Sequence, residues 1–590
     1  MINYFKKLNR ISFVIFFILL MIATIIIRCI NLQYVENKNY SNKIEKREIR
    51  EQNIKASRGI IIDRNKNILA DSILLDTLEV NDPKLFLNKN NKEKIQELCR
   101  VINKKCSSII ANIENKKDKK SIYLKRQITS LEEIKKIHEL NLHGIGFKKE
   151  SQRFYPEGET FASLIGKTNK DHIGHMGLEL SFDKHLKEID GKKIVRQDKN
   201  GSRVKDIRLV RPPQDGKNLL LTIDKRLQYV AYRELERQIK SINAESGSVV
   251  ILDTTNGDIL AAASYPSYDP NDKNAYTIEG ERNRAIVDSI EPASTIKPFL
   301  VTAALHSGKL TLKDVIDTSP GYIKYKNKVY KDNNKNYGPL TAEGIILKSS
   351  NVGSIKISER FDKKIYFSLL DYVGIGEMIN INFPSEIEGD LKHHSEWSNS
   401  DVRSHAIGYA FKVTPLQLAK AYSIIANEGK IIHPRILKNV AIQKNKNQKY
   451  KESFIKVKKI LRKNVESGTG YNAAVKGYTV AGKTGTAELY TGGKNEKYNT
   501  KEHISLFAGI TPVSKPKLVI VVVISEPKTK AKQFYGSKVA APVFSKIATD
   551  SLRILNISPD NIQDYQNQVS MKIESVGNNS LKTLEVQNVF

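Results

Sequence analysis

Ser294 and Lys297 lie in a segment, residues 291–299, whose side chains could form an acylating pair. They are three residues apart, so on a helix they would share one face. Pro298 fits only the first turn of a helix, where its missing N–H would have no partner. Ser294 would then lie at the positive end of that helix. A serine needs a base before it can attack, and a lysine serves as one only when its pKa is depressed. The pair therefore predicts a nucleophilic serine beside a neutral lysine.

Two more motifs follow in the chain. A Ser-x-x-Lys match alone is weak, because 96 of 590 residues are Lys or Arg and such a match is often a solvated helix face. The Ser-Ser-Asn of residues 349–351 follows an apolar helical run, and a helix should carry Ser349. The Lys-Thr-Gly-Thr of residues 483–486 follows residues 478–481, which are predicted to form a strand. Ser-x-x-Lys, Ser-x-Asn and Lys-Thr-Gly in this order form the signature of serine penicillin-recognising enzymes.

The elements around these motifs predict an antiparallel sheet. Residues 249–253, which are apolar up to Leu252, and the apolar residues 259–263 are joined by Thr-Asn-Gly-Asp, a strong hairpin signal. Three late strands are expected around Lys483, at 504–510 and at 518–525. The last is an uninterrupted apolar run and should be central in its sheet. Late strands that pair with an early hairpin imply an α+β fold with helices packed around the sheet.

The N-terminal region predicts a single transmembrane helix. Residues 11–27 carry no charge, and Lys6, Lys7 and Arg10 precede them, so the N-terminus should be cytoplasmic and the bulk of the chain outside. A cleaved signal peptide is the competing interpretation. The apolar run exceeds a usual signal-peptide core and lacks a small-x-small cleavage site, which favours an uncleaved anchor.

The length of 590 residues indicates two or more domains. A polar stalk is expected at 33–57, and a domain boundary near Asn243. The last residues, rich in Asn, Gln and Ser, should be weakly ordered. The expected organisation is a cytoplasmic tail (1–10), a transmembrane helix (11–30), a mixed α/β domain (45–243), the domain with the three motifs (244–552) and a tail (553–590).

The chain is strongly basic, with a formal net charge of +32 and a pI near 9.6. Such a charge could attract nucleic acid or anionic lipid and cell-wall polymers. No nucleic-acid motif occurs and the lysines are scattered among asparagines. The basic charge is therefore interpreted as a general bias in amino-acid composition, and no nucleic-acid partner is expected.

The cysteines and histidines predict no metal site. Cys29, Cys99 and Cys106 are odd in number and contain no Cys-x-x-Cys, so neither zinc nor a disulfide framework is indicated. A bridge between Cys99 and Cys106 stays open for an oxidising compartment. Arg28 stands before Cys29, where lipoprotein processing needs a small residue. The 11 histidines show no metal-ligand pattern.

With these motifs, the chain resembles a class B penicillin-binding protein from residue 1 to about residue 550. The family has a non-catalytic, elongated pedestal domain, to which the mixed α/β domain would correspond. Within the class, the amino-acid sequence of residues 291–295 and 349–353 is most similar to that of the FtsI-type cell-division transpeptidase. Further matching segments are Arg58-Gly-x-x-x-Asp63-Arg-Asn65, Arg153-x-Tyr-Pro-x-Gly158, Asn283-Arg-Ala285, His503-Ile-Ser505, Tyr535-Gly536 and residues 540–544.

The resemblance implies a peptidoglycan D,D-transpeptidase that needs no cofactor and no metal. Ser294 would attack the penultimate D-Ala carbonyl of a stem peptide, Lys297 would take its proton, and an amine of a neighbouring stem would resolve the acyl-enzyme. The N–H groups of Ser294 and Thr486 would form the oxyanion hole. The implied catalytic residues are Ser294, Lys297, Ser349 and Asn351, and the implied substrate-binding residues are Lys483, Thr484, Gly485 and Thr486.

The implied surroundings are the bacterial cytoplasmic (inner) membrane, with the catalytic domain outside the cytoplasm and a role in septum formation. Implied partners are stem peptides, β-lactams, a glycosyltransferase of the SEDS family and other divisome proteins. Two alternatives stay open, an elongation-type enzyme and a catalytically silent penicillin-binding scaffold. Carboxypeptidases and β-lactamases would use water as the acceptor, and the pedestal segments argue against both.

Two departures from the family pattern concern the substrate groove. Ala293 stands where the family usually has glycine before the serine, and alanine would be strained if that position needs a positive φ. The family's Ser-Phe-Gly-Tyr-Gly is Ala-Ile-Gly-Tyr-Ala here and ends at Ala410. Neither change removes a catalytic group.

Overall fold

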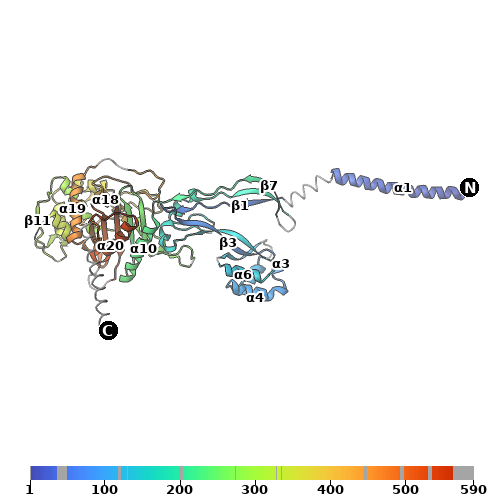
Figure 1. Cartoon of the computed structure of the whole chain (residues 1–590), viewed down its shortest axis with the longest axis horizontal. Coiled ribbons are helices and arrows are strands. Elements are labelled where there is room, and N and C mark those ends of the chain that lie inside the picture. Colours follow the sequence, from blue (N-terminus) through green and yellow to red (C-terminus); the bar gives the residue numbers. More distant parts are fainter. Residues whose placement is uncertain are drawn as a thin grey trace, which may run out of the picture. The chain divides into compact units, whose positions relative to one another are not determined.

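A computed structural model describes most of the chain. It forms two compact units, residues 1–59 with 187–216 and residues 60–186 with 217–590, and each is described separately (Figure 1). The described residues are 2–35, 49–116, 121–128, 130–169, 171–197, 203–272, 274–326, 328–333, 335–443, 448–491, 497–528 and 534–561.

The first unit contains the N-terminal helix α1 (Ile2–Ile30), followed by a short π-helical turn, Asn31–Val35. Its segment Ile11–Tyr34 has a mean hydropathy of 2.9, long and apolar enough to cross a membrane. One helix of this kind was expected at 11–30, and the structure has it.

A three-stranded antiparallel sheet completes the first unit. Strand β6 (Gly191–Gln197) lies between β1 (Ile49–Ile54) and β7 (Arg203–Arg211). The predicted stalk at 33–57 is therefore wrong at β1. Polar composition suggested a linker, but the backbone of β1 is paired with a strand about 140 residues later, and composition does not reveal such long-range pairing.

The N-terminal part of the second unit is a mixed sheet with its own helices. The strand order is β4-β3-β2-β8, and β5 also pairs with β3. In Figure 1, α3, α4 and α6 lie beside the end of β3. The strands are β2 (Ile61–Ile62), β3 (Ile68–Val80), β4 (Ile122–Ile128), β5 (Ile145–Phe154) and β8 (Leu219–Leu220). The helices are α3 (Pro83–Phe86), α4 (Lys92–Val101), α5 (Cys106–Glu114), α6 (Leu131–Glu139), α7 (Ala162–Ile165), α8 (Gly177–Ser181) and α9 (Asp183–Leu186).

Cys99 and Cys106 form a disulfide between α4 and the start of α5, with their Cα atoms 5.5 Å apart. The sequence indicated no disulfide framework but left this single bridge open, and the structure has it. The turn between the helices brings the two side chains together, and their spacing in the chain does not predict this approach.

The C-terminal part of the second unit contains a five-stranded, fully antiparallel sheet in the order β10-β9-β17-β16-β15. The predicted hairpin is β9 (Ser246–Asp253) with β10 (Ile259–Tyr265). Strand β17 (Leu518–Ser525) lies in the centre, which confirms the prediction from its apolar run. The strand expected around Lys483 is β15 (Ala481–Thr491), which contains the Lys-Thr-Gly motif, and the strand expected at 504–510 lies within its partner β16 (Lys497–Thr511). Residues 478–480, also expected to be in a strand, precede β15, so that part of the prediction is wrong.

Helices cover both faces of this sheet, as the α+β prediction required. Val249 and Ile251 of β9 pack with α10 (Lys225–Ile242) and α20 (Gly536–Ile554), which lie side by side in Figure 1. The alternate residues of β9, such as Val250, face the other core, because successive strand residues point to opposite sides. That core contains α13 (Lys297–His306), α18 (Pro415–Ala426) and α19 (Lys451–Ser467).

Smaller elements surround the second core. The helices are α11 (Ile278–Glu281), α12 (Arg284–Val287), α14 (Ala342–Lys348), α15 (Asn351–Ser358), α16 (Lys363–Tyr372) and α17 (Asn399–Ala406). Two short antiparallel strand pairs are β11 (Val315–Asp317) with β14 (Pro339–Thr341), and the hairpin of β12 (Tyr322–Tyr325) with β13 (Lys328–Lys331).

The predicted weakly ordered tail begins too early. Helix α20 runs to Ile554, and the Asp560 carboxylate accepts hydrogen bonds from Thr479 N and Ser514 Oγ, both at 2.7 Å. Residues 553–561 therefore belong to the folded unit. The rest of the predicted tail, 562–590, lies outside the described residues.

Candidate active site

Ser294 lies in a 3-10 turn, Ala293–Ile296, that leads into α13. Pro298 is in the first turn of α13, which confirms the predicted change from loop to helix. Ser294 is half-buried and lines a groove of about 640 Å³. Its Oγ makes no hydrogen bond to another described residue, so the hydroxyl is available to a ligand in the groove.

Lys297, three residues after Ser294, is completely buried. Its Nζ donates to Asn351 Oδ1 and to Ser349 O, both at 2.7 Å, and lies 3.5 Å from Ser349 Oγ. Burial lowers the pKa of Lys297 from its ordinary value of 10.5 to about 7, against an opposing effect of the Asp332 carboxylate. A substantial neutral fraction at neutral pH follows, and a neutral amine can accept a proton.

Lys483 of strand β15 is also completely buried, and like Lys297 it contacts Ser349. Its Nζ donates to Ser349 Oγ at 3.0 Å and to Thr469 Oγ1 at 3.3 Å. Burial, and after it the charge of Lys297, lowers the pKa of Lys483 well below 10.5. Two buried ammonium groups around one hydroxyl repel each other, so the charge of one favours the neutral form of the other.

Ser349 is the C-cap residue of α14, with φ 58° in the left-handed region. It therefore lies between helices α14 and α15, and the expectation that a helix carries it is wrong. The left-handed residue reverses the chain after α14. The reversal lets Asn351 begin α15, and its Nδ2 donates to Lys331 O at 2.9 Å.

The Lys-Thr-Gly motif runs along β15, next to the turn that contains Ser294. A Cβ at Gly485 would lie 3.0 Å from Thr295 Cγ2 and 3.2 Å from Pro292 O, so glycine permits this close approach. Thr484 Oγ1 donates to Thr469 Oγ1 at 3.1 Å, and Thr486 Oγ1 accepts from Gly536 N at 3.0 Å.

The structure thus brings together all eight residues that the sequence singled out. Lys297 and Lys483 are buried beside the groove, and both contact Ser349. Those that line the groove are Ser294, Ser349, Asn351, Thr484, Gly485 and Thr486.

Sequence reasoning missed two residues that hold this arrangement. The buried Asp332 accepts from Ser350 Oγ at 2.6 Å, from Asn351 N at 2.5 Å and from Val352 N at 3.0 Å, and so caps α15. Thr469 contacts both Lys483 and Thr484. Neither residue lies in one of the motifs, and no local pattern marks either of them.

Both alanines that replace a family glycine adopt positive φ, 47° at Ala293 and 65° at Ala410. Ala293 N donates to Gly408 O at 3.0 Å, and Ala410 N donates to Glu291 Oε1 at 2.8 Å. These bonds join the nucleophile's turn to residues 408–410. The expected backbone strain is therefore present at both alanines, at about 1 kcal/mol each. Both alanines lie where the two segments contact each other.

Comparison with known proteins agrees with this geometry. A family model described as the penicillin-binding protein transpeptidase domain matches residues 247–549. The chain belongs to this family. A second model, the penicillin-binding protein dimerisation domain, matches residues 53–221. The matched ranges lie within the two domains predicted at 244–552 and 45–243, whose precise bounds stay predictions.

Members of the penicillin-binding protein family resemble the chain over most of its length. The probable peptidoglycan D,D-transpeptidase PenA of Neisseria gonorrhoeae is 36% identical over 559 residues, 93% of this chain and 94% of the relative. Peptidoglycan D,D-transpeptidase FtsI of Escherichia coli K12 is 35% identical over 548 residues, 92% and 91% of the two chains. The solved transpeptidase domain of Burkholderia pseudomallei penicillin-binding protein 3 is 31% identical with a TM-score of 0.52, and the match covers 58% of this chain and 97% of that domain.

Proposed function

We propose that this protein is a peptidoglycan D,D-transpeptidase that forms an acyl-enzyme at Ser294. The observation that carries the proposal is the contact of Ser349 Oγ with both Lys297 and Lys483. Both lysines are fully buried and have a depressed pKa, and they lie next to the groove that Ser294 lines. Such an arrangement can take a proton at one atom and deliver it to another without a metal. The family membership and the relatives named D,D-transpeptidases support the same reaction.

In the first half-reaction Ser294 Oγ attacks the carbonyl carbon of the penultimate D-Ala, and neutral Lys297 accepts the hydroxyl proton. The C–N bond to the terminal D-Ala then breaks. Ser349, which contacts both Lys297 and Lys483, passes a proton to the leaving nitrogen. Asn351 holds Lys297 in place through its 2.7 Å hydrogen bond.

The substrate is held from the β15 side of the groove. Thr484, which lines the groove, binds the terminal carboxylate, and Lys483, buried directly behind the groove, completes this binding site. Gly485 lets the strand approach the turn closely enough for both walls to contact one peptide. The N–H groups of Ser294 and Thr486 stabilise the oxyanion. In the second half-reaction an amine of a neighbouring stem peptide attacks the ester carbonyl, releases Ser294 and leaves a cross-link.

β-Lactams would acylate Ser294 as well. Opening the lactam ring breaks an amide bond without releasing a leaving group, so the attached fragment blocks the acceptor amine and the ester persists. The full chain should therefore be labelled by a fluorescent penicillin, with a mass increase equal to one intact penicillin.

Labelling with fluorescent penicillin followed by mass spectrometry tests the assignment. Ser294→Ala should abolish labelling and keep the fold, since a small side chain at the start of α13 costs little. Ser307→Ala is a matched control at the other end of α13, where Ser307 is the C-cap, and it should label normally. Labelling that persists in Ser294→Ala would reject the nucleophile, and an unlabelled wild-type chain would favour a silent scaffold.

For its cellular role we propose septal peptidoglycan synthesis. This choice is supported by the amino-acid sequence of residues 291–295 and 349–353 and by the similarity to the protein named FtsI. Depletion should give filaments with blocked septa, and round cells would point to the elongation enzyme instead. A SEDS-family glycosyltransferase and other divisome proteins are the partners that such a role implies.

The proposed location is the bacterial inner membrane, with α1 as a single uncleaved anchor. The basic residues before Ile11 support a cytoplasmic N-terminus. Alkaline phosphatase fused after residue 60 should be active. An inactive fusion there, with an active cytoplasmic reporter at the same point, would reverse the orientation.

A further inference from the structure

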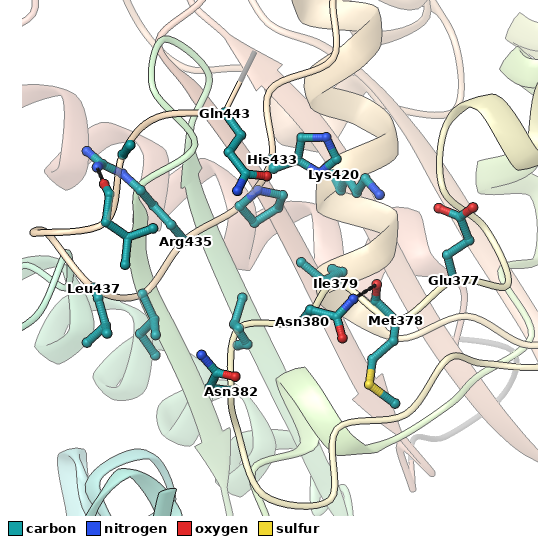
Figure 2. A pocket seen from close by; sticks show the side chains of 15 residues that line it. Glu377, Met378, Ile379, Asn380, Asn382, Lys420, His433, Arg435, Leu437 and Gln443 are labelled. Atoms are coloured by element: carbon teal, nitrogen blue, oxygen red, sulfur yellow. Dashed lines mark hydrogen bonds between the residues drawn. The ribbon is translucent and has the colours of Figure 1, made fainter. Parts of the chain in front are cut away.

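A second pocket, of about 340 Å³, lies away from the groove of Ser294 and shares no lining residue with it. Its walls come from residues 377–382 and 433–443, and Lys420 of α18 reaches it. Figure 2 shows Lys420 and His433 close together in this pocket, with Glu377 on the side to which Lys420 points. The reaction proposed above uses none of these residues.

Lys420 is the unusual member of this pocket. Lys420 is only 4% exposed, yet its ammonium group donates no hydrogen bond and forms no ion pair within the described part of the chain. The two buried lysines of the active site differ, because Lys297 and Lys483 each donate to nearby oxygens. Burial lowers the pKa of Lys420, against an opposing effect of the Glu377 carboxylate, so the charge of this ammonium group is only partly compensated in the pocket wall. A ligand that carries a negative charge would supply the missing partner.

The other charges around the pocket are mostly committed to each other. Arg435 Nε lies 2.7 Å from Asp258 Oδ1, and Lys438 Nζ lies 2.6 Å from Asp258 Oδ2. Glu377 is exposed and forms no ion pair with Lys420 among the described residues. Burial, and then the charge of Lys420, lowers the pKa of His433, which favours its neutral form. The lining itself contains two cations, Lys420 and Arg435, and one carboxylate, Glu377, so its charge balance favours an anion.

The remaining lining combines three amide side chains, Asn380, Asn382 and Gln443, with apolar side chains, and both kinds limit what that anion can be. Met378, Ile379, Ile436, Leu437 and Val440 line the pocket. An inorganic anion would leave these side chains without contacts, whereas an organic ligand would cover them. The volume is within the range of small-molecule sites.

We propose that this pocket binds a small organic carboxylate, whose charge pairs with Lys420 and whose apolar body packs against Ile379. Lys420 supplies the charge recognition from α18. The two loop segments supply the apolar contacts. The site is independent of the transpeptidase reaction, so its existence does not depend on the function proposed above.

Isothermal titration of the full-length protein with isovalerate tests the proposal, with isovaleramide as the uncharged isostere and inorganic phosphate as the inorganic anion. Isovalerate should bind at one site with a millimolar Kd. The amide and phosphate should each bind at least about tenfold more weakly. Equal affinity for the amide would overturn the role of charge, and tighter binding of phosphate would overturn the choice of an organic ligand. No binding at tens of millimolar isovalerate would overturn the site.

Variants locate the bound carboxylate. Lys420→Met should weaken isovalerate binding by at least about tenfold. Lys456→Met, which removes the same charge from an exposed position on α19, should bind like the wild type. Glu377→Gln should bind about two- to threefold more tightly because a repelling charge is lost. Unchanged binding in Lys420→Met, or weaker binding in Glu377→Gln, would contradict the proposal.

A folding control keeps the result interpretable. Lys420→Met removes a buried cation without a partner, so its melting temperature should stay the same or rise. Should that variant not fold, Ala441→Trp fills the pocket from an exposed position and should abolish binding. Isovalerate binding that survives Ala441→Trp would place the ligand elsewhere and reject this pocket.

Discussion

At the scale of single residues, the proton acceptor is the test of the proposed chemistry. Lys297→Arg keeps a positive charge but cannot accept a proton, since a guanidinium does not deprotonate in proteins. Acylation by penicillin should therefore slow by roughly 10²-fold or more, the usual size of general-base catalysis. Stopped-flow or quenched labelling measures the rate. Near-normal acylation in the Arg variant would mean that Lys297 supplies only charge.

The pKa of Lys297 predicts the pH dependence of the same rate. Because the neutral amine is the active form and the pKa is about 7, the acylation rate should rise as pH increases through 7 and level off above it. Below pH 6 it should fall about tenfold for each pH unit, since the neutral fraction falls in that proportion. Second-order acylation rates between about pH 5 and 9 check this. A rate that falls as pH rises through 7 would contradict a neutral Lys297 as the base.

Ala410 tests the strain at positive φ. It is exposed, so Ala410→Gly loses little packing while relieving the left-handed conformation. The free energy of unfolding should rise by about 0.5–1 kcal/mol. Ala111→Gly, at an exposed position inside α5, should lower it by about 1 kcal/mol. Chemical denaturation measures both, and an equal loss in the two variants would show that Ala410 is not strained.

At the scale of elements, the cap of α15 positions Asn351. Asp332→Asn weakens the acceptor of two backbone N–H groups and a serine hydroxyl at the start of this helix. We expect about 1–3 kcal/mol lower stability, the range for a disturbed buried hydrogen-bond network. We also expect acylation to slow by roughly tenfold, because Asn351 loses its position beside Lys297.

A second cap serves as the control for this experiment. Asp362 accepts from Lys364 N at the start of α16, and neither residue lines the groove of Ser294. Asp362→Asn should reduce stability by at most about 1 kcal/mol without changing the acylation rate. If the Asp332 and Asp362 variants acylate equally fast, Asp332 only stabilises the fold and does not position Asn351.

At the scale of the whole molecule, the disulfide between Cys99 and Cys106 reports on the compartment. If the bulk of the chain lies outside the cytoplasm, as proposed, these two cysteines should resist alkylation in the denatured protein until a reductant is added, whereas Cys29 should react. A version without residues 1–30, retained in the cytoplasm, should alkylate at both Cys99 and Cys106. Mass spectrometry of the alkylated peptides measures this. Free thiols at both positions in the full-length protein would contradict the proposed location.

Much of the fold could be predicted from the sequence because its signals are local. The apolar run of β17, the hairpin of β9 and β10, and the proline in the first turn of α13 each act over a few residues. Predictions failed where distant pairing decided the structure. Strand β1 pairs with β6 far along the chain, and Asp560 binds Thr479 and Ser514 from beyond α20.

The sequence by itself determined the chemical identity of the candidate site and the order of its three motifs. Residue types and short spacings are covalent properties, so Ser294, Lys297 and the Lys-Thr-Gly motif could be read without a fold. Only the tertiary structure decided that Ser349 Oγ, 52 residues from Lys297 and 134 from Lys483, contacts both amines. It also decided that both lysines are buried. Desolvation depends on everything packed around a group, so the motif could require a neutral lysine for the reaction, but only the fold shows the burial that lowers its pKa.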